Sequence, residues 1–416
     1  MLWIGYRAAR GKADIKRFGE YFGYALLKQR PKGKKLLWFH AASLGEVKGI
    51  YPIVYKLSEK FPELTILLTT TTVSGAEEAK KINPGRIIHQ YMYVDCPQVV
   101  KRFFDSWQPD CVVFFESELW PNTLKHISKL KKTGIKAILL NGRMSPSSVK
   151  KWGYIKSLLV EMLKPFDLII AASKRDVKNF SIFTAEQKIK YFGNIKYAIN
   201  DLEIQDRNKK NSLLLNCNNR SVFLCASIHP GEGEIILKSY MELRHQIPKL
   251  LTIIVPRHVT YCYALAREIK MLNIKFALRS QTTEITNDTE IYLVDTFGEL
   301  AGLYQFADVA FVGGSLIKHG GQNILEAAYA KVPVVIGPYY DNFANIVEEM
   351  LEGTDALNKQ PGIIIVHNGK ELAASVHLLL TNQEKRNQII TNSSKVLQNH
   401  NDVLIRTMEE IEKIIS

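Results

Sequence analysis

Residues 36 to 47 read LLWFHAASLGEV, a pattern that predicts a buried strand turning directly into a helix. Leu36 to Phe39 form an apolar run, and Gly45 is a small residue in the turn that follows. The apolar residues after the turn recur at helical spacing: Val47, Ile50, Val54 and Leu57. Ligands of open α/β sheets bind at the carboxyl ends of the strands. Glu46 therefore stands where a functional carboxylate is expected.

Glu46 has two interpretations from this segment alone. It is a candidate catalytic base, because a carboxylate at the end of a buried strand can accept a proton from a bound substrate. Alternatively, Ser43 stands three residues before Glu46, and this spacing is typical of a capping box that satisfies the first amides of a helix.

Length and composition predict an ordinary protein of the soluble type with about two domains. The chain has 416 residues, of which 46% are hydrophobic and 23% charged. Its five cysteines lie far apart without a CxxC pair, which predicts reduced packing residues of a cytosolic protein and neither a disulfide framework nor a metal site. They are Cys96, Cys111, Cys217, Cys225 and Cys262.

Short β-rich runs alternate with helical patterns along the whole chain, which predicts an α/β protein with doubly wound parallel sheets. The strands expected in the first half are 36–40, 64–70, 86–91, 110–116, 135–141, 167–172 and 189–193. Those expected in the second half are 221–227, 250–255, 274–278, 290–295, 308–313, 333–336 and 362–366.

The polar stretch from Asn200 to Asn219 has the most linker-like composition inside the chain. We therefore expect one domain over residues 1–200, a linker over 201–219 and a second domain over 220–416. The tail from 382 to 416 is expected to close the second domain with one or two helices. Two such sheets are expected to leave a ligand cleft between them.

The net charge of +14 is concentrated near the amino terminus, where residues 1 to 35 hold ten Lys and Arg against two acids. Apolar residues fall at helical spacing there, which predicts a short basic amphipathic helix: Ile15, Phe18, Phe22 and Leu26. Such a helix can lie on an anionic membrane or lipid, pack on its own domain, or bind nucleic acid. No nucleic-acid-binding motif accompanies the charge. The sequence also has no run of about 18 apolar residues and no signal peptide.

Acidic and basic residues follow several expected strands of the first half. Five apolar residues lead directly into Glu116, which predicts a positioned functional group, and Glu118 follows it. Either acid can instead interact with the start of the next helix, an interpretation that suits Glu118 better. Arg143 and Lys196 end two further strands and are candidate clamps for an acidic group or solvated strand ends.

The second half contains two small-residue turns that suit a phosphate. Residues 226–234, ASIHPGEGE, turn from strand to helix and include Ser227. Residues 312–315, VGGS, contain paired glycines expected to expose backbone amides, Gly314 among them. Asn323 and Glu326 lie on one face at the start of the next helix, where Glu326 is either a ribose-binding carboxylate or half of a structural ion pair.

Other chemistries lack their motifs. The sequence has no HExxH, clustered Cys/His or Asp-x-Asp motif, so no metal site is predicted. It also has no Walker loop and no G-x-S-x-G nucleophile elbow.

Six motifs in colinear order resemble the 3-deoxy-D-manno-octulosonic acid (Kdo) transferases of lipopolysaccharide synthesis. They are HAASLGEV at 40–47, ESELWPN at 116–122, GNIK at 193–196, PRH at 256–258, FGEL at 297–300 and FVGGSLIKHGGQNILE at 311–326. The resemblance spans nearly the whole chain. It implies the GT-B architecture of two facing Rossmann-like domains with a cleft between them, and transfer of Kdo from CMP-Kdo to a lipid A precursor of the lipid IVA type.

The resemblance also implies roles for individual residues. Glu46 matches the general base, and Glu116 and Lys196 match positions that stabilise the transition state. The implied CMP-binding residues are Ser227, Pro256, Arg257, Phe297, Gly298, Glu299, Gly314, Asn323, Ile324, Leu325 and Glu326. Residues placed at the acceptor side are Ser43, Gly45, Glu118 and Arg143. No cofactor and no metal are expected.

The sequence departs from the family pattern at several positions. The phosphate turn reads SIHPGE where a Thr and a Glu are commoner around the His, and Gln322 and Ile324 replace a commoner His and Pro. The apolar membrane anchor of the family is not found in residues 1–23. We therefore expect either a shortened chain or peripheral docking, through the basic amino terminus, on the cytoplasmic face of the bacterial inner membrane.

The predicted function is that of an inverting Kdo transferase with Glu46 as general base. One alternative is a GT-B enzyme that uses another nucleotide sugar, such as a UDP-sugar transferase or epimerase. A second alternative is a basic adaptor on a membrane surface or nucleic acid, which the carboxylates at Glu46, Glu116 and Glu326 disfavour because they would repel a polyanion.

Overall fold

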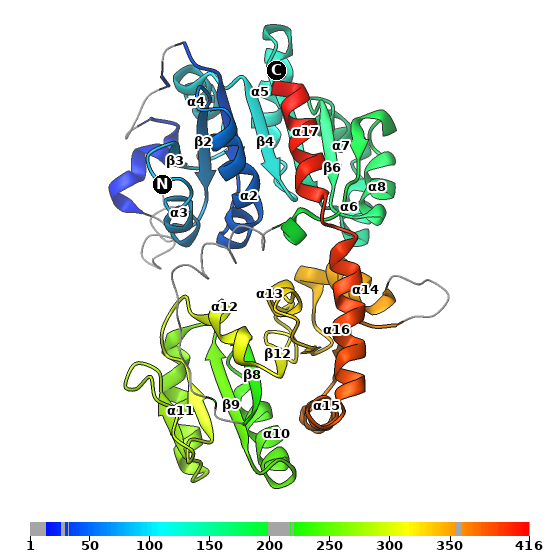
Figure 1. Ribbon diagram of the computed structural model, residues 1–416. Helices are drawn as coiled ribbons and strands as arrows, with labels where there is room; N and C mark the ends of the chain where they lie inside the picture. The colour runs from blue at the N-terminus through cyan, green and yellow to red at the C-terminus, as the bar shows by residue number, and fades with distance from the viewer. Residues whose placement is uncertain are drawn as a thin grey trace. The chain divides into compact units, whose positions relative to one another are not determined.

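The computed structural model describes residues 14–25, 30–31, 33–198, 217, 220–353 and 360–415, and the chain forms two compact units (Figure 1). The first unit contains Met1–Ile199 together with His400–Ser416, and the second contains Asn200–Asn399. The expectation that the whole tail closes the second domain is therefore wrong for its last part. The helix α17 (Val403–Ile415), red in Figure 1, packs on the first unit. Most of the expected linker, 201–219, lies outside the described residues.

The first unit is built on a seven-stranded parallel sheet with the order β3-β2-β1-β4-β5-β6-β7. The strands are β1 (Leu36–His40), β2 (Thr65–Thr70), β3 (Ile87–Tyr91), β4 (Cys111–Phe115), β5 (Lys136–Gly142), β6 (Leu168–Ala171) and β7 (Ile189–Lys190). The order reverses beside β1, so that β1 lies between β2 and β4. In such a sheet, the crevice at this reversal is where ligands bind.

Helices cover both faces of this sheet. Side chains alternate between the two faces along each strand, and apolar residues on both faces pack against helices. Leu36 and Trp38 join one core cluster, which includes α4 and α5, while Leu37 and Phe39 join the other, which includes α2 and α17. The helices before α17 are η1 (Ile15–Phe22), α2 (Leu44–Lys60), α3 (Val73–Ala79), α4 (Pro97–Trp107), α5 (Pro121–Leu130), η2 (Lys131–Thr133), α6 (Pro146–Gly153), α7 (Lys156–Leu163), α8 (Lys174–Ser181), η3 (Glu186–Lys188) and η4 (Ile195–Ala198).

The second unit repeats this plan with the strand order β10-β11-β9-β8-β12-β13-β14, again parallel. Its strands are β8 (Ser221–Ile228), β9 (Leu250–Pro256), β10 (Phe276–Leu278), β11 (Ile291–Leu293), β12 (Val309–Val312), β13 (Val334–Ile336) and β14 (Ile363–Ile365). Its helices are α10 (Gly233–Gln246), η5 (Val259–Tyr261), α11 (Cys262–Met271), α12 (Leu300–Leu303), η6 (Tyr304–Phe306), α13 (Leu325–Tyr329), η7 (Asp341–Phe343), α14 (Ala344–Glu352), α15 (Gly369–Thr381) and α16 (Gln383–Gln398). Every strand range expected from the sequence overlaps an observed strand, which confirms the doubly wound α/β class.

The amino-terminal segment agrees only in part with the expected amphipathic helix. Ile15–Phe22 form a 3₁₀ helix whose buried side chains are Glu20 and Tyr21, while Ile15 is 70% exposed. Glu20 accepts a hydrogen bond from the Tyr91 amide at 2.7 Å and pairs with Arg17 at 2.8 Å. Phe18 and Phe22 of the predicted apolar face pack on a small cluster of Tyr21, Ala76 and Tyr91. This segment therefore packs on its own unit through both apolar and polar contacts, and Leu26 lies outside the described residues.

The exposure of the cysteines corrects one expectation. Cys111, Cys225 and Cys262 are buried and Cys217 is intermediate, but Cys96 is exposed and is not a packing residue. Among the described residues, no helix is both long and apolar enough to cross a bilayer.

The helix α2 approaches the sheet closely at Gly49. A Cβ atom at this position would lie 2.7 Å from Cζ of Phe115, which is fully buried on β4. Only a residue without a side chain lets α2 lie at this distance from the strand. The contact fixes the height of α2, and with it the position of Glu46 at the start of the helix, above the sheet.

We expect Gly49→Ala to destabilise the protein by about 1–3 kcal/mol, because the new methyl group would force the fully buried ring of Phe115 or the helix to shift. Urea unfolding measures the change. Gly45→Ala is the matched control in the same helix: its Cβ meets nothing within 4 Å, so stability should change by less than about 1 kcal/mol and in the favourable direction. Equal stability of the two variants would contradict the close approach.

Candidate active site

Glu46 lies in the first turn of α2 and closes a small ring of hydrogen bonds. Its Oε2 accepts from the Ala42 amide at 2.9 Å, and its Oε1 accepts from the Ser43 hydroxyl at 2.9 Å. Ser43 caps the helix by accepting from the Glu46 amide. The capping interpretation of this pair is therefore confirmed, and the same contacts hold the carboxylate in one orientation.

The electrostatics of Glu46 suit proton transfer. Burial, together with the negative charges of Glu118 and Glu116, raises the pKa of Glu46 to about 7. The hydrogen bonds from Ala42 and Ser43 lower this pKa but do not outweigh the burial. A carboxylate with a pKa near neutrality accepts a proton far more readily than an ordinary one. The neighbouring Gly45 is exposed and leaves open space at the turn.

Glu118 lies beside the end of β1 and is held by two ring nitrogens. His40 Nε2 lies 3.4 Å from Glu118 Oε2, and Trp120 Nε1 donates to the same oxygen at 2.9 Å. Burial acts to raise the pKa of Glu118, but the contacts with His40 and Trp120 outweigh it and bring the pKa below its ordinary value. His40 is fully buried and its Nδ1 contacts Thr69 Oγ1 at 2.9 Å. Glu118 is therefore a fixed negative charge near Glu46.

Glu116 follows β4 and pairs with the two predicted cations. Lys196 Nζ lies 2.6 Å from Glu116 Oε1, and Arg143 Nη1 lies 3.7 Å from Glu116 Oε2. The backbone of Glu116 has φ 59°, a left-handed conformation that costs free energy for a residue with a side chain. Such strain is common at functional positions, where it directs a side chain toward a ligand.

The backbone around Lys196 is held by two asparagines. Asn141, the sixth residue of β5, accepts from the Ile195 amide through Oδ1 at 3.2 Å, and Asn194 Oδ1 accepts from the Lys196 amide at 3.0 Å. Asn141 is 1% exposed and has φ 53°. Among the described residues, its Nδ2 has no hydrogen-bond partner, which marks an available donor at the end of the sheet.

The first unit therefore assembles predicted residues from the ends of four strands. The loops after β1, β4, β5 and β7 supply Glu46, Glu116 with Glu118, Arg143 and Lys196. The result is a carboxylate with a raised pKa beside an ion-paired group of two cations and one anion. This arrangement can remove a proton from a substrate and stabilise developing charge.

In the second unit, Glu232 joins the two small-residue turns. Its Oε2 accepts from the amides of His229 at 2.9 Å and Gly314 at 2.7 Å, and its Oε1 accepts from the amides of Ser315 and Leu316, both at 3.0 Å. Glu232 is fully buried. Gly313 lies against it, since a Cβ there would be 2.8 Å from Glu232 Oε2. One carboxylate thus fixes the turn after β8 to the turn after β12.

This bridge corrects the expectation that the paired glycines expose their amides. The Gly314 amide donates to Glu232 and is not available to a phosphate. At the other turn, the hydroxyl of Tyr261 takes backbone hydrogen bonds from Gly231 and Gly233, while burial raises the pKa of Tyr261. The hydroxyl of Ser227 has no hydrogen-bond partner within the described ranges, and its φ is 53°.

A histidine cluster surrounds the turn after β8. His229 and His319 have ring centroids 3.9 Å apart, His258 lies 6.1 Å from His229, and Gln322 Nε2 contacts His229 Nε2 at 3.0 Å. Burial, followed by the nearby His319, His258 and Arg257, lowers the pKa of His229 to about 4. His229 is therefore neutral at pH 7.

Pro256 ends β9, and Arg257 follows it beside this cluster. Pro256 is buried, and the Arg257 amide donates to the Ile228 carbonyl at 2.9 Å. In the part of the chain that the structure describes, no acidic side chain pairs with the guanidinium of Arg257. Its charge is thus available to an anionic ligand.

The segment around Gly298 combines an exposed ring with a fixed carboxylate. Phe297 is 77% exposed, and Gly298 has φ +90°. Glu299 pairs with Arg279 at 2.8 Å and accepts a hydrogen bond from the Thr296 hydroxyl. The hydrogen bond from Arg279 holds the pKa of Glu299 below its ordinary value. The Glu299 carboxylate is therefore already bound by Arg279 and Thr296.

Glu326 is the second residue of α13, and the segment Asn323–Leu325 leads into it. The side chains of Ile324 and Leu325 are buried, so only their backbone can face a ligand. Asn323 Oδ1 accepts from the Leu325 amide at 3.0 Å. Among the described residues, no hydrogen bond or ion pair is made by the partly buried carboxylate of Glu326. Of its two predicted interpretations, the structural ion pair is not observed there.

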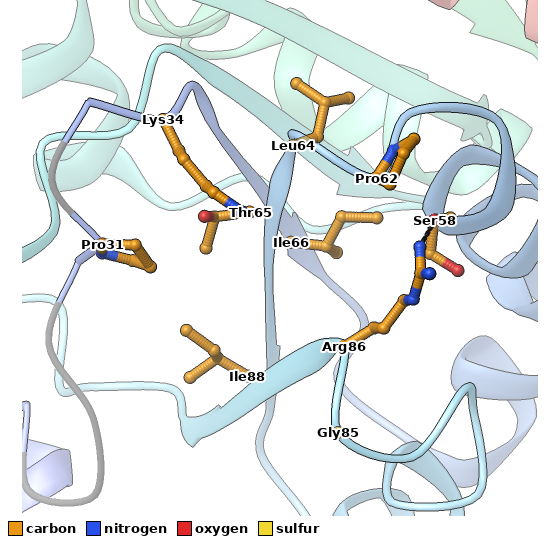
Figure 2. A pocket seen from close by; sticks show the side chains of 10 residues that line it. All are labelled: Pro31, Lys34, Ser58, Pro62, Leu64, Thr65, Ile66, Gly85, Arg86 and Ile88. Atoms are coloured by element: carbon orange, nitrogen blue, oxygen red, sulfur yellow. Dashed lines mark hydrogen bonds between the residues drawn. The ribbon is translucent and has the colours of Figure 1, made fainter.

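A cavity of about 390 Å³ in the first unit lies away from these residues (Figure 2). It opens at the amino-terminal ends of β2 and β3 and is lined by Lys34, Thr65, Ile66 and Ile88, among others. Arg86 reaches across its rim to donate to the Ser58 carbonyl at 2.9 Å. None of the predicted site residues lines it. Within the described ranges, no three His, Cys, Asp or Glu side chains gather in a way that could hold a metal ion.

Three structural roles were missed by sequence reasoning. His40 lies in the first motif and Glu232 in the phosphate turn, yet neither had been given a role. A buried strand ending in a histidine was the available signal for His40. For Asn141 no local signal exists, because its partner lies 54 residues away in the chain. Glu232 has one near partner, the His229 amide, but its bonds to the amides of Gly314, Ser315 and Leu316 reach 82 to 84 residues along the chain and have no local signal.

We expect Glu232→Gln to destabilise the second unit by about 2–3 kcal/mol, because its amide group would turn N–H donors toward two buried backbone N–H groups. Unfolding followed by circular dichroism in urea measures the change. Glu234→Gln is the matched control, since Glu234 is 72% exposed and pairs with Lys238; its effect should stay below about 0.5 kcal/mol. A Glu232→Gln variant as stable as this control would refute the bridging role.

Sequence comparisons identify relatives of both units. Residues 16–199 match the sequence model of 3-deoxy-D-manno-octulosonic-acid transferases, and residues 272–396 match that of glycosyl transferases group 1. The chain is 32% identical over 412 residues to the 3-deoxy-D-manno-octulosonic acid transferase of Haemophilus influenzae, covering 98% of this chain and 94% of that protein. It is 31% identical over 392 residues to the Rickettsia prowazekii protein of the same name, covering 94% and 82%.

Solved structures show the same fold at low sequence identity. A glycosyltransferase from Rickettsia africae has a TM-score of 0.57 at 16% identity, covering 92% of this chain and 99% of that one. This likeness places the two Rossmann-like units in the GT-B class. The chain therefore belongs to the 3-deoxy-D-manno-octulosonic acid transferase family and is a glycosyltransferase.

Proposed function

We propose that the protein transfers Kdo from CMP-Kdo to a lipid A precursor by an inverting single displacement. Glu46 removes the proton from a sugar hydroxyl of the acceptor while that oxygen attacks the anomeric carbon of Kdo. The new C–O bond forms as the bond from this carbon to the phosphate of CMP breaks, and CMP leaves with the electron pair. Membership of the Kdo transferase family supports the choice of sugar.

The observation that carries the role of Glu46 is its environment. A buried carboxylate with a pKa of about 7 can take a proton near neutral pH, and the bonds from Ala42 and Ser43 hold it in place. The helix cap and the base are thus two functions of one geometry.

The charges around Glu116 support a role in stabilising the transition state. Kdo carries an acid group, and Lys196 and Arg143 present two cations at the carboxyl end of the same sheet. Glu116 holds both cations, because it pairs with each of them. Together with Ser43, Gly45 and Glu118, Arg143 is proposed to line the acceptor side.

In the second unit, the available groups favour a nucleotide. The guanidinium of Arg257 is proposed to neutralise the phosphate of CMP, and the carboxylate of Glu326 to accept hydroxyl hydrogen bonds from its ribose. Phe297, being exposed, can lie against the base. The Gly314 amide is not proposed to bind the phosphate, since it already donates a hydrogen bond to Glu232.

We further propose that the leaving phosphate needs no metal cofactor, because Arg257 supplies the positive charge. The acceptor is a membrane lipid, so we place the protein at the cytoplasmic face of the inner membrane. The excess of Lys and Arg in residues 1–35 supports attraction to anionic lipid there.

The experiment that tests the function is product analysis by mass spectrometry. The protein is incubated with CMP-Kdo and a tetra-acylated lipid A precursor, and UDP- and GDP-sugars serve as alternative donors. We expect the mass of one or more Kdo units on the acceptor with CMP-Kdo alone. Glu46→Gln keeps the shape but removes the base, so kcat should fall by about two orders of magnitude or more. Near-normal turnover by this variant would contradict the assignment of Glu46 as the base.

The raised pKa of Glu46 also predicts a pH dependence. The base is active only when deprotonated, so kcat/KM should fall as the pH drops below about 7. Glu118→Gln removes a negative neighbour and lowers the pKa of Glu46. The fall of kcat/KM at acidic pH, here called the acid limb, should therefore move to lower pH. Glu161→Gln is the control, because Glu161 is 67% exposed and pairs with Lys164. A limb that stays in place in Glu118→Gln would contradict the electrostatic coupling.

A further inference from the structure

The start of α17 touches the segment that carries Lys196, here called the Lys196 segment (residues 192–198). The rings of His400 and Tyr197 are stacked, with centroids 3.9 Å apart and planes 4° from parallel. The guanidinium of Arg406 lies 4.6 Å from the ring of Phe192. These contacts join two parts of the chain that are separated by the entire second unit.

His400 also lies against the backbone on the other side of Lys196. A Cβ atom at Gly193 would be 2.4 Å from His400 Nδ1 and 2.6 Å from Val403 Cγ2. Gly193 has φ +115°, so both its conformation and its neighbours require glycine. The imidazole ring thus contacts residues on both sides of Lys196 in the sequence.

The position of this segment decides where the Lys196 ammonium group lies. A lysine side chain has many rotamers, so its charge is fixed only when its backbone and its partner are fixed. Asn141 and Asn194 accept hydrogen bonds from the amides of Ile195 and Lys196. His400 contacts the same segment at Tyr197 and Gly193, while Lys196 Nζ reaches Glu116 Oε1 at 2.6 Å.

We infer that His400 is a positioning residue for Lys196, acting through its stack on Tyr197 and its contact with Gly193. This inference rests on the proposed catalytic role of Lys196. In this inference His400 acts through Lys196 and not directly on the reacting atoms. Supports of this kind set the geometry of a site to within fractions of an ångström, and small displacements reduce the rate strongly.

The attachment of α17 does not depend on His400, so the ring can be removed without releasing the helix. Val403, Leu404, Met408 and Ile411 of α17 are buried in the core cluster that also contains α2 residues. Lys190 and Glu410 add an ion pair at 2.5 Å. The His400 side chain is only partly buried.

The test compares the kcat of two variants at this position. His400→Ala removes the ring and should lower kcat by about tenfold or more, with the KM for CMP-Kdo changed less than about twofold. His400→Phe keeps a flat ring and should retain most of the activity. Ile405→Ala, at a residue of α17 that is 56% exposed, is the matched control and should leave kcat unchanged. If His400→Ala does not fold, His400→Leu replaces it with the same expectation.

Combination with Lys196→Met separates this inference from the proposed function. Lys196→Met should lower kcat, and adding His400→Ala should then change kcat by less than about twofold, because the group being positioned is gone. If Lys196→Met leaves kcat unchanged, the proposed role of Lys196 fails, and this inference with it. If Lys196→Met lowers kcat but His400→Ala does not, or the two effects multiply, or His400→Phe is as impaired as His400→Ala, the inference alone is overturned.

Discussion

The parallel pairing of β1 with β4, and of β8 with β12, is the constraint on which both units depend. The strand order reverses at each of these pairs. The loops that follow the two paired strands therefore begin side by side at the carboxyl end of the sheet. In the first unit, these loops carry Glu46, Glu116 and Glu118. In the second unit, the same pair of loops is joined by Glu232. Each unit therefore places buried or partly buried carboxylates at the same topological point.

The two carboxylates, Glu46 and Glu232, differ in the number of donors that surround them. Glu232 accepts four backbone N–H groups, which compensate its burial and make it a structural bridge. Glu46 accepts one backbone N–H and one hydroxyl, and two negative neighbours face it. Incomplete compensation raises the pKa of Glu46 to about 7, and this is the condition for proton transfer at neutral pH.

Most of the fold could be predicted from the sequence, because buried parallel strands appear as continuous apolar runs bounded by turn residues. The candidate base was also predictable, since its strand, turn and helix are contiguous. The helix α17 was assigned to the wrong unit because its apolar face, Leu404, Met408 and Ile411, fits any core of suitable shape. In the amino-terminal segment, Phe18 and Phe22 of the predicted apolar face pack on Tyr21 and Tyr91, whereas Ile15 is exposed and the buried ion pair of Arg17 with Glu20 was not predicted.

The sequence by itself determined the two doubly wound sheets, the strand-end position of Glu46 and the resemblance that led to the Kdo transferase family. These depend on local periodicity and short motifs. Only the tertiary structure decided that Glu232 occupies the Gly314 amide, that Glu116 pairs with Lys196, and that His400 stacks on Tyr197. Each of these contacts joins residues far apart in the chain, and their geometry follows from strand order and packing, which local sequence patterns do not encode.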